Sequence, residues 1–178
     1  MPEENGDFKE VIDNLQEEVK NKTKKGRKKV NKLKGLRCYL AGPIDHADDD
    51  GKGWRTKAQK WLEKKKVFVF NPCDKPISYQ QYKEIDEEKT KMMALKESGR
   101  FFELTQRMKE IVHVDLRMVD VSDMVIVYID PKTPMFGTIH ELINSLQQRK
   151  PTLVVVEGGK EKAPNWLFDG FQFYVWFF

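Results

Sequence analysis

The chain has only two cysteines and lacks any long apolar run. Cys38 and Cys73 form no Cys-x-x-Cys pair and have no histidine at metal-ligand spacing, so we expect two reduced thiols and no metal site. A membrane-spanning helix needs roughly 18 or more consecutive apolar residues. No such run occurs, and no apolar secretory segment follows a basic start. These absences predict a cytoplasmic protein with no membrane partner.

A dinucleotide-binding glycine pattern is also missing. No Gly-x-Gly-x-x-Gly follows the first expected strand, which ends at Gly42-Pro43. Such a pattern lets the backbone approach a pyrophosphate at a helix N-terminus. Its absence disfavours a dinucleotide, and we expect no cofactor.

Charge is concentrated at the start of the chain. Residues 1–20 carry a net charge of −5, whereas residues 21–34 carry eight Lys or Arg and no acid, although the whole 178-residue chain has a net charge of only +4. We therefore divide the chain into a charged arm, residues 1–34, and one folded domain, residues 35–178. In the arm, residues 8–19 have the apolar spacing of an amphipathic helix. The basic run that follows fits a solvated linker, with a tether to nucleic acid as the alternative.

Apolar strands alternate with amphipathic helices along the folded domain. This alternation predicts an α/β fold with a doubly wound parallel sheet, flavodoxin-like or Rossmann-like. We expect strands at 36–41, 67–70, 124–129 and 151–156, and helices at 52–65, 107–121 and 137–148. A polar, largely helical insertion over 75–110 is expected to pack as helices or to cover the ligand, and the aromatic tail at 171–178 to add a core or interface strand.

Glu141 is the first candidate for chemistry. It lies one helical turn beyond Gly137-Thr138, after the uniformly apolar strand 124–129, which is typical of a buried parallel strand. Ligands of open α/β sheets bind at the carboxyl ends of the strands. Glu141 is therefore a candidate nucleophile, and the alternative is a first-turn glutamate stabilised by the helix dipole.

Tyr39 and Gly42-Pro43 bring a second strand end toward the same crevice. The Tyr39 phenol could reach Glu141, and Gly42 could let the backbone approach a ligand closely. The alternative for Tyr39 is simple core packing. A further carboxylate, Asp115, precedes Glu141 by 26 residues and is a candidate acid for a leaving group.

These segments together resemble the nucleoside 2-deoxyribosyltransferase family over residues 36–168. The resemblance rests on Tyr-Leu-Ala-Gly-Pro at 39–43, Asp-Leu at 115–116 and Gly-Thr-x-x-Glu at 137–141. It implies that residues 35–178 form a catalytic domain that transfers a 2-deoxyribosyl group between a nucleoside and a free nucleobase. The intermediate would be a covalent glycosyl ester of a glutamate, and the enzyme would be a homo-oligomer with shared active sites.

The resemblance also implies individual roles. Glu141 would be the nucleophile, Tyr39 would hydrogen-bond and orient it, and Asp115 would lie on the base side of the sugar. Asn165 would reach into a neighbouring subunit to hold the sugar 5′-hydroxyl. The further expected substrate contacts are Gly42, Pro43, Gln81, Gly137 and Thr138.

The sequence departs from the family pattern before the Gly-Thr pair. Where the family usually has an acid for the sugar 3′-hydroxyl, this chain has Met135-Phe136, and the nearest acid is Asp130. Asp130 would either replace the missing acid or cap the turn.

Two other functions remain open from the sequence. One is an N-glycosidase that hydrolyses deoxynucleoside 5′-monophosphates; four aspartates between positions 45 and 50 oppose a phosphate there, although Lys52 and Arg55 follow. The other is a non-enzymatic nucleoside-binding module, in which Glu141 only begins a helix.

Overall fold

The computed structural model describes residues 30–75, 85–168 and 175–177. The amphipathic pattern at 8–19, most of the basic run and Gln81 therefore lie outside the described residues. The predictions made for them stay predictions.

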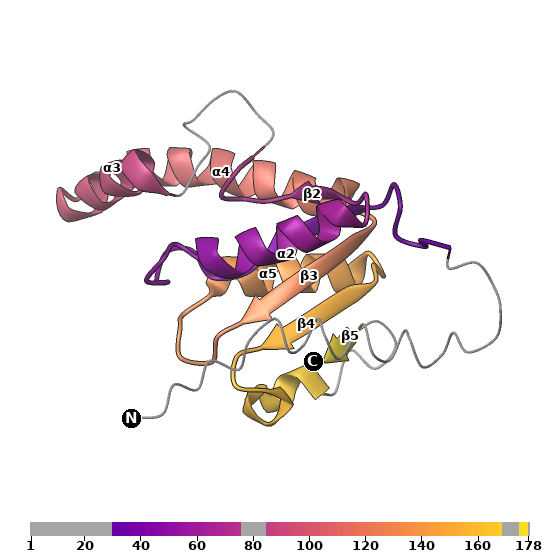
Figure 1. The fold of residues 1–178 in the computed structure, drawn as a ribbon. Helices are drawn as coiled ribbons and strands as arrows, with labels where there is room; N and C mark the ends of the chain where they lie inside the picture. Colours follow the sequence, from indigo (N-terminus) through magenta and orange to yellow (C-terminus); the bar gives the residue numbers. More distant parts are fainter. Residues whose placement is uncertain (1–29, 76–84, 169–174, 178) are drawn as a thin grey trace.

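The core of the fold is a five-stranded, entirely parallel sheet in the order β2-β1-β3-β4-β5 (Figure 1). This is the strand order of the flavodoxin-like doubly wound folds, so the predicted fold class is confirmed. The strands are β1 (Arg37–Ala41), β2 (Phe68–Phe70), β3 (Met124–Ile129), β4 (Thr152–Val156) and β5 (Val175–Phe177). The strand expected in the aromatic tail is thus present over its described part.

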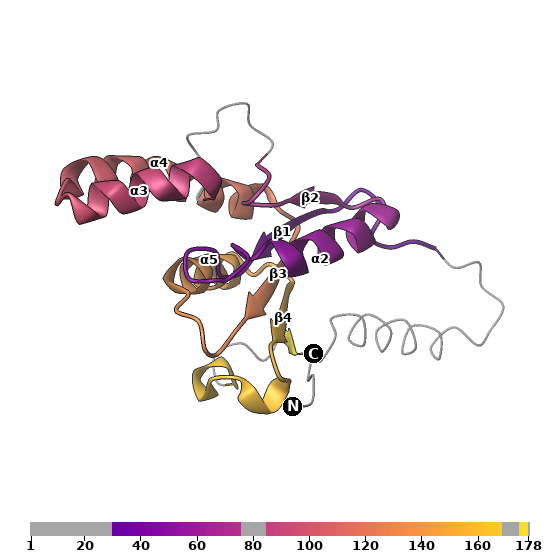
Figure 2. The same cartoon turned by 60° about the vertical axis from the view of Figure 1, so that its left-hand side comes forward.

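Helices cover both faces of the sheet (Figures 1 and 2). Helix α2 (Lys52–Lys64) lies on one face, and α4 (Phe101–Val121) and α5 (Phe136–Gln147) lie on the other. Helix α3 (Asp86–Glu97) runs alongside α4, and both project beyond the sheet. Two short 3₁₀ turns, η2 (Lys160–Lys162) and η3 (Asn165–Phe168), follow β4.

Alternation along the strands divides the buried side chains into two clusters. Tyr39 and Val127 pack toward α4 and α5, whereas Leu40 and Ile126 pack toward α2. Successive side chains of a strand point to opposite faces, so a buried sheet needs apolar residues at every position. This explains why the central strand has no polar residue and was predicted accurately.

The helical insertion differs from the prediction at its C-terminal boundary. A separate helix was expected to begin at 107, but α4 is one helix of 21 residues that begins at Phe101. Gly99 is the last strong helix breaker before Val121, so nothing interrupts the helix. Phe101 and Phe102 at the start of this helix are 62% and 75% exposed.

Gly42 and Gly137 give a matched test of this packing. An added Cβ at Gly42 would lie 2.5 Å from Trp54 Cζ2, whereas at Gly137 it would meet nothing within 4 Å. We expect Gly42→Ala to lower the free energy of unfolding by about 1–3 kcal/mol through overpacking. Gly137→Ala, inside α5, should be neutral or stabilising by up to ~1 kcal/mol. Urea denaturation measures both, and equal effects would contradict the packing described for Gly42.

Candidate functional site

The strand order reverses between β1 and β3, and Tyr39, Gly42 and Asp130 lie on the two strands and loops at this switch point. Tyr39 of β1 is the register partner of Val125 in β3 and of Phe70 in β2. The loops that leave the carboxyl ends of β1 and β3 begin at Gly42 and Asp130. Doubly wound sheets bind ligands in the crevice at such a point.

Tyr39 and Glu141 are in direct contact. The Tyr39 hydroxyl donates a hydrogen bond to Glu141 Oε1, with the two oxygens 2.5 Å apart. Tyr39 is fully buried, while Glu141 on α5 is partly exposed. Burial first, and then the charges of Glu141 and Asp115, raise the pKa of Tyr39 well above its usual value. The phenol therefore stays protonated and holds one oxygen of the carboxylate in place.

Asp115 belongs to the same electrostatic cluster. It lies on the inner face of α4, and its charge acts on Tyr39. Its Oδ1 forms an ion pair with Nζ of Lys75 at 2.7 Å. The structure thus brings together the three residues predicted to be catalytic, and adds a buried lysine that the sequence analysis did not select.

Gly137 and Thr138 have a different local structure from the one expected. The sequence suggested a tight glycine turn before the helix, but α5 begins at Phe136 and Gly137 lies within its first turn. Thr138 is buried on the inner face of that helix. The turn was wrongly predicted because Gly is usually a helix breaker, whereas here its lack of a side chain leaves open space beside the helix N-terminus.

Gly42 has a role in packing, while its expected approach to a ligand stays a prediction. The space where its side chain would lie is filled by the Trp54 indole, not by room for a ligand. Trp54 in turn stacks on Tyr128, with ring centroids 5.1 Å apart. Gly42 is therefore needed for packing between the end of β1 and helix α2.

A cavity of about 260 Å³ lies beside this aromatic pair. Asp130 lines it, and its carboxylate accepts hydrogen bonds from the Lys132 backbone N–H at 2.9 Å and from the Thr133 hydroxyl at 2.5 Å. Asp130 thus caps the turn, as one of its two expected roles required, and also faces the cavity. The other lining residues include Pro43, Asp48, Trp54 and Tyr128.

Arg55 fixes the loop that follows β1. Its guanidinium is fully buried and donates to the backbone carbonyls of Leu40, Gly42, Pro43 and Gly51 at 2.6–3.4 Å. Buried carbonyls need such donors, and the fork of the guanidinium supplies several at once.

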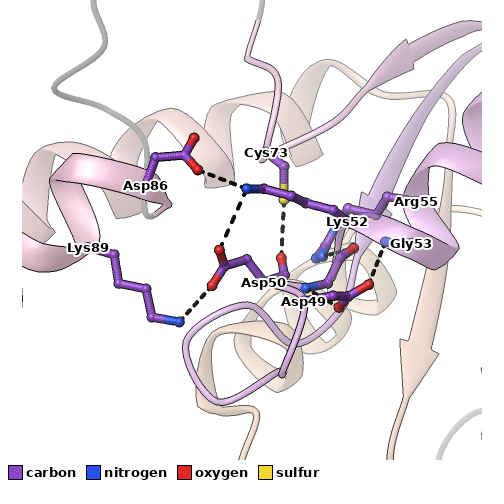
Figure 3. Close-up of polar contacts among 9 residues, drawn as sticks. Asp49, Asp50, Lys52, Gly53, Arg55, Cys73, Asp86 and Lys89 are labelled. Carbon is purple, nitrogen blue, oxygen red and sulfur yellow. Dashed lines mark hydrogen bonds and ion pairs between the residues drawn. The ribbon is translucent and has the colours of Figure 1, made fainter.

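Two aspartates of this loop, Asp49 and Asp50, contact other protein groups (Figure 3). Asp49 accepts from the N–H groups of Gly51 and Gly53 and so caps α2. Asp50 pairs with Lys89 of α3 at 2.6 Å, while Lys52 lies 2.8 Å from Asp86 and 3.6 Å from Asp50. The loop is therefore tied to α3 through two lysines.

Asn165 lies on the surface and on a different element from Tyr39, Asp115 and Glu141. It is the first residue of η3 and is exposed, as is the neighbouring Trp166. Gln81 lies outside the described residues, so its expected contact with a base stays a prediction.

The sequence predicts Arg55 only as a nearby cation and does not indicate Lys75. A signal for Arg55 was present, since it shares the i, i+3, i+7 spacing of Ala58 and Leu62 on the inner face of α2. Lys75 offers no such signal, because its burial results from a contact with α4 forty residues later.

Comparison of the chain with protein-family models and with curated proteins gives no match. In the described ranges, no helix is long and apolar enough to cross a membrane. Over the same residues, no group of three or more His, Cys, Asp or Glu side chains is placed to hold a metal ion.

Replacing Arg55 should destabilise the fold more than replacing an exposed arginine. Arg55→Met would leave several buried carbonyls without donors, at about 1–3 kcal/mol for each group that water cannot reach. Arg37→Met is the control, because the Arg37 side chain pairs with Asp123 at 2.7 Å but is 48% exposed, and it should cost much less. Thermal and urea unfolding of both variants test this, and a neutral Arg55→Met would show that the loop does not depend on it.

Proposed function

We propose that this protein is a nucleoside deoxyribosyltransferase that exchanges the base of a 2′-deoxynucleoside through a covalent intermediate on Glu141. The observation that carries the proposal is the hydrogen bond between the buried Tyr39 phenol and Glu141 at the carboxyl end of the switch-point strands. It joins two of the three motifs that resemble the family.

The chemistry follows from the states of these groups. One oxygen of the Glu141 carboxylate attacks C1′ while the bond to the base breaks, and a glycosyl ester forms. A second base then attacks C1′ and returns the carboxylate, with net retention of configuration. Tyr39, kept neutral by its raised pKa, holds the other oxygen and so orients the nucleophile.

The hydrolysis of nucleoside monophosphates is less well supported. Binding a phosphate needs available cations or backbone N–H groups. In the described residues, Arg55 donates hydrogen bonds to backbone carbonyls, and Lys52 forms ion pairs with Asp86 and Asp50. The carboxylates of the loop add negative charge where the phosphate would lie, which favours an uncharged nucleoside.

An oligomer is also part of the proposal. The outer face of α5 presents three apolar side chains at positions 136, 139 and 143, and Phe136 is 90% exposed. Glu141 is the only charged residue of this helix. A neutral apolar stripe suits contact with a second copy, and it lies on the helix that carries the nucleophile. Asn165 would then serve the sugar of a neighbouring site.

Glu141→Gln tests the nucleophile directly. The amide keeps the shape of the side chain and can still accept from Tyr39, but it cannot form the ester. We expect base exchange between thymidine or deoxyinosine and excess adenine to fall by ~10³-fold or more, followed as deoxyadenosine by chromatography. The matched control Glu97→Gln, at the exposed end of α3, should keep full activity. A Glu141→Gln enzyme with near-normal exchange would refute the proposal, as would release of base from monophosphates alone.

Shared sites predict complementation between two inactive variants. Asn165→Ala should lower turnover without dissociating the oligomer, since Asn165 is exposed and packs little. When Asn165→Ala and Glu141→Gln subunits are mixed and reassembled, some sites gain both native residues and activity should return in part. Sedimentation checks the subunit number, and a fully active monomer would contradict this arrangement.

A further inference from the structure

The Lys75–Asp115 ion pair is buried beside the proposed nucleophile. No part of the Lys75 side chain is exposed, and the Asp115 side chain is 9% exposed. Asn71 fixes the turn that leads to Lys75: its side chain accepts from the Cys73 N–H at 3.0 Å and donates to Gln59 at 2.9 Å. Both members of the pair are thus held by separate, ordered elements.

A buried ion pair of this kind adds little to the stability of a fold. Lysine is almost never fully buried, and removing two charges from water often costs more than their attraction returns. Apolar residues of the same size would serve a core equally well. The position of the pair next to Tyr39 and Glu141 therefore points to a use in chemistry.

The pair also determines which group carries the proton. A carboxylate that faces an ammonium group at 2.7 Å is ionised and can only accept hydrogen bonds. Asp115 as it stands therefore has no proton for a departing base. Lys75 is the nearest proton-bearing cation that the described residues provide.

We propose that Lys75 is a positioning residue that stores the proton of the base-side carboxylate. This inference rests on the proposed function. As the C1′–base bond breaks, an N–H bond of Lys75 aligns on Asp115 and breaks, Asp115 takes the proton, and its O–H bond then gives the proton to the nitrogen of the leaving base. The products are a neutral base, a neutral Lys75 amine, an ionised Asp115 and the glycosyl ester of Glu141.

The second half-reaction returns the proton by the reverse route. The incoming base loses its N–H proton to Asp115 as it attacks C1′, and Asp115 passes the proton back to Lys75. A store that water cannot reach keeps the proton between the two steps, which suits exchange between bases. Tyr39 of β1 is within electrostatic reach of Asp115, of Glu141 on α5 and of Arg55 on α2.

Two deoxynucleoside substrates distinguish delivery of the proton from the other steps of the reaction. Deoxyguanosine needs a proton on its departing base, whereas the base of 7-methyl-2′-deoxyguanosine is already cationic and leaves without one. With excess adenine as acceptor, we expect Lys75→Met to lower turnover of deoxyguanosine by ~100-fold or more, within the usual range for general acid catalysis. Formation of the glycosyl ester from the methylated donor should fall by less than tenfold.

Lys75→Arg is the decisive variant. It keeps the ion pair, but a guanidinium does not release its proton in proteins. The proposal predicts that Lys75→Arg loses turnover of deoxyguanosine, as Lys75→Met does. Both variants should still form the glycosyl ester from the methylated donor. If Lys75 is merely structural, arginine should restore deoxyguanosine turnover, and that result would overturn the proposal. Equal losses with the two donors would also overturn it.

A measurement on the unaltered protein tests the same proposal if the Lys75 variants do not fold. The solvent deuterium isotope effect on ester formation should be clearly above one with deoxyguanosine and close to one with the methylated donor, and equal values would overturn the role of Lys75. Glu141→Gln should abolish ester formation from both donors. If the unaltered protein exchanges the base of thymidine or deoxyinosine but turns over neither guanine donor, the proposed function stands and the inference fails; if it exchanges none of these bases, both fail.

Discussion

The buried guanidinium of Arg55 is the constraint on which the carboxyl end of β1 depends. It joins carbonyls from the strand end and from the loop that returns to α2, so the chain can turn there without leaving buried acceptors unsatisfied. Gly42 must then lack a side chain, because Trp54 fills that space. With the loop fixed in this way, Tyr39 is held two residues before the strand end, in reach of Glu141.

Four charged groups lie close to the sheet and are stabilised in three different ways. Glu141 is partly exposed and accepts from Tyr39, Asp115 is paired with Lys75, and Arg55 is solvated by backbone carbonyls. Removing Asp115 would leave the buried Lys75 ammonium without its partner, whereas Glu141 would remain partly exposed to water. Tyr39 lies at the centre of this set, and its raised pKa has contributions from both carboxylates and an opposing one from Arg55.

The sequence was sufficient to predict the fold, because buried parallel strands are recognisable from local composition. The central strand and the helices that follow β1 and β3 came out within a residue or two of their predicted ends. Contacts between distant residues could be predicted only where a motif supplied them, as it did for Tyr39 and Glu141. The burial of Lys75 could not be predicted because it depends on α4, and the packing role of Gly42 could not be predicted because its neighbour Trp54 is identified only by packing. The start of α4 was misplaced because a polar helix that projects beyond the core has little apolar periodicity.

Exposure decreases from the proposed nucleophile to the proposed proton store. Glu141 is partly exposed, Asp115 nearly buried and Lys75 fully buried. A nucleophile must be reached by C1′ of a substrate, whereas a stored proton is kept only if solvent cannot exchange it. A site that transfers a sugar between two bases needs both conditions at once, because water at the glycosyl ester would give hydrolysis instead of exchange. The Lys75 ammonium is buried against Asp115, so solvent does not reach its proton, while Glu141 stays accessible to C1′. A costly buried ion pair therefore fits a transferase better than a binding module.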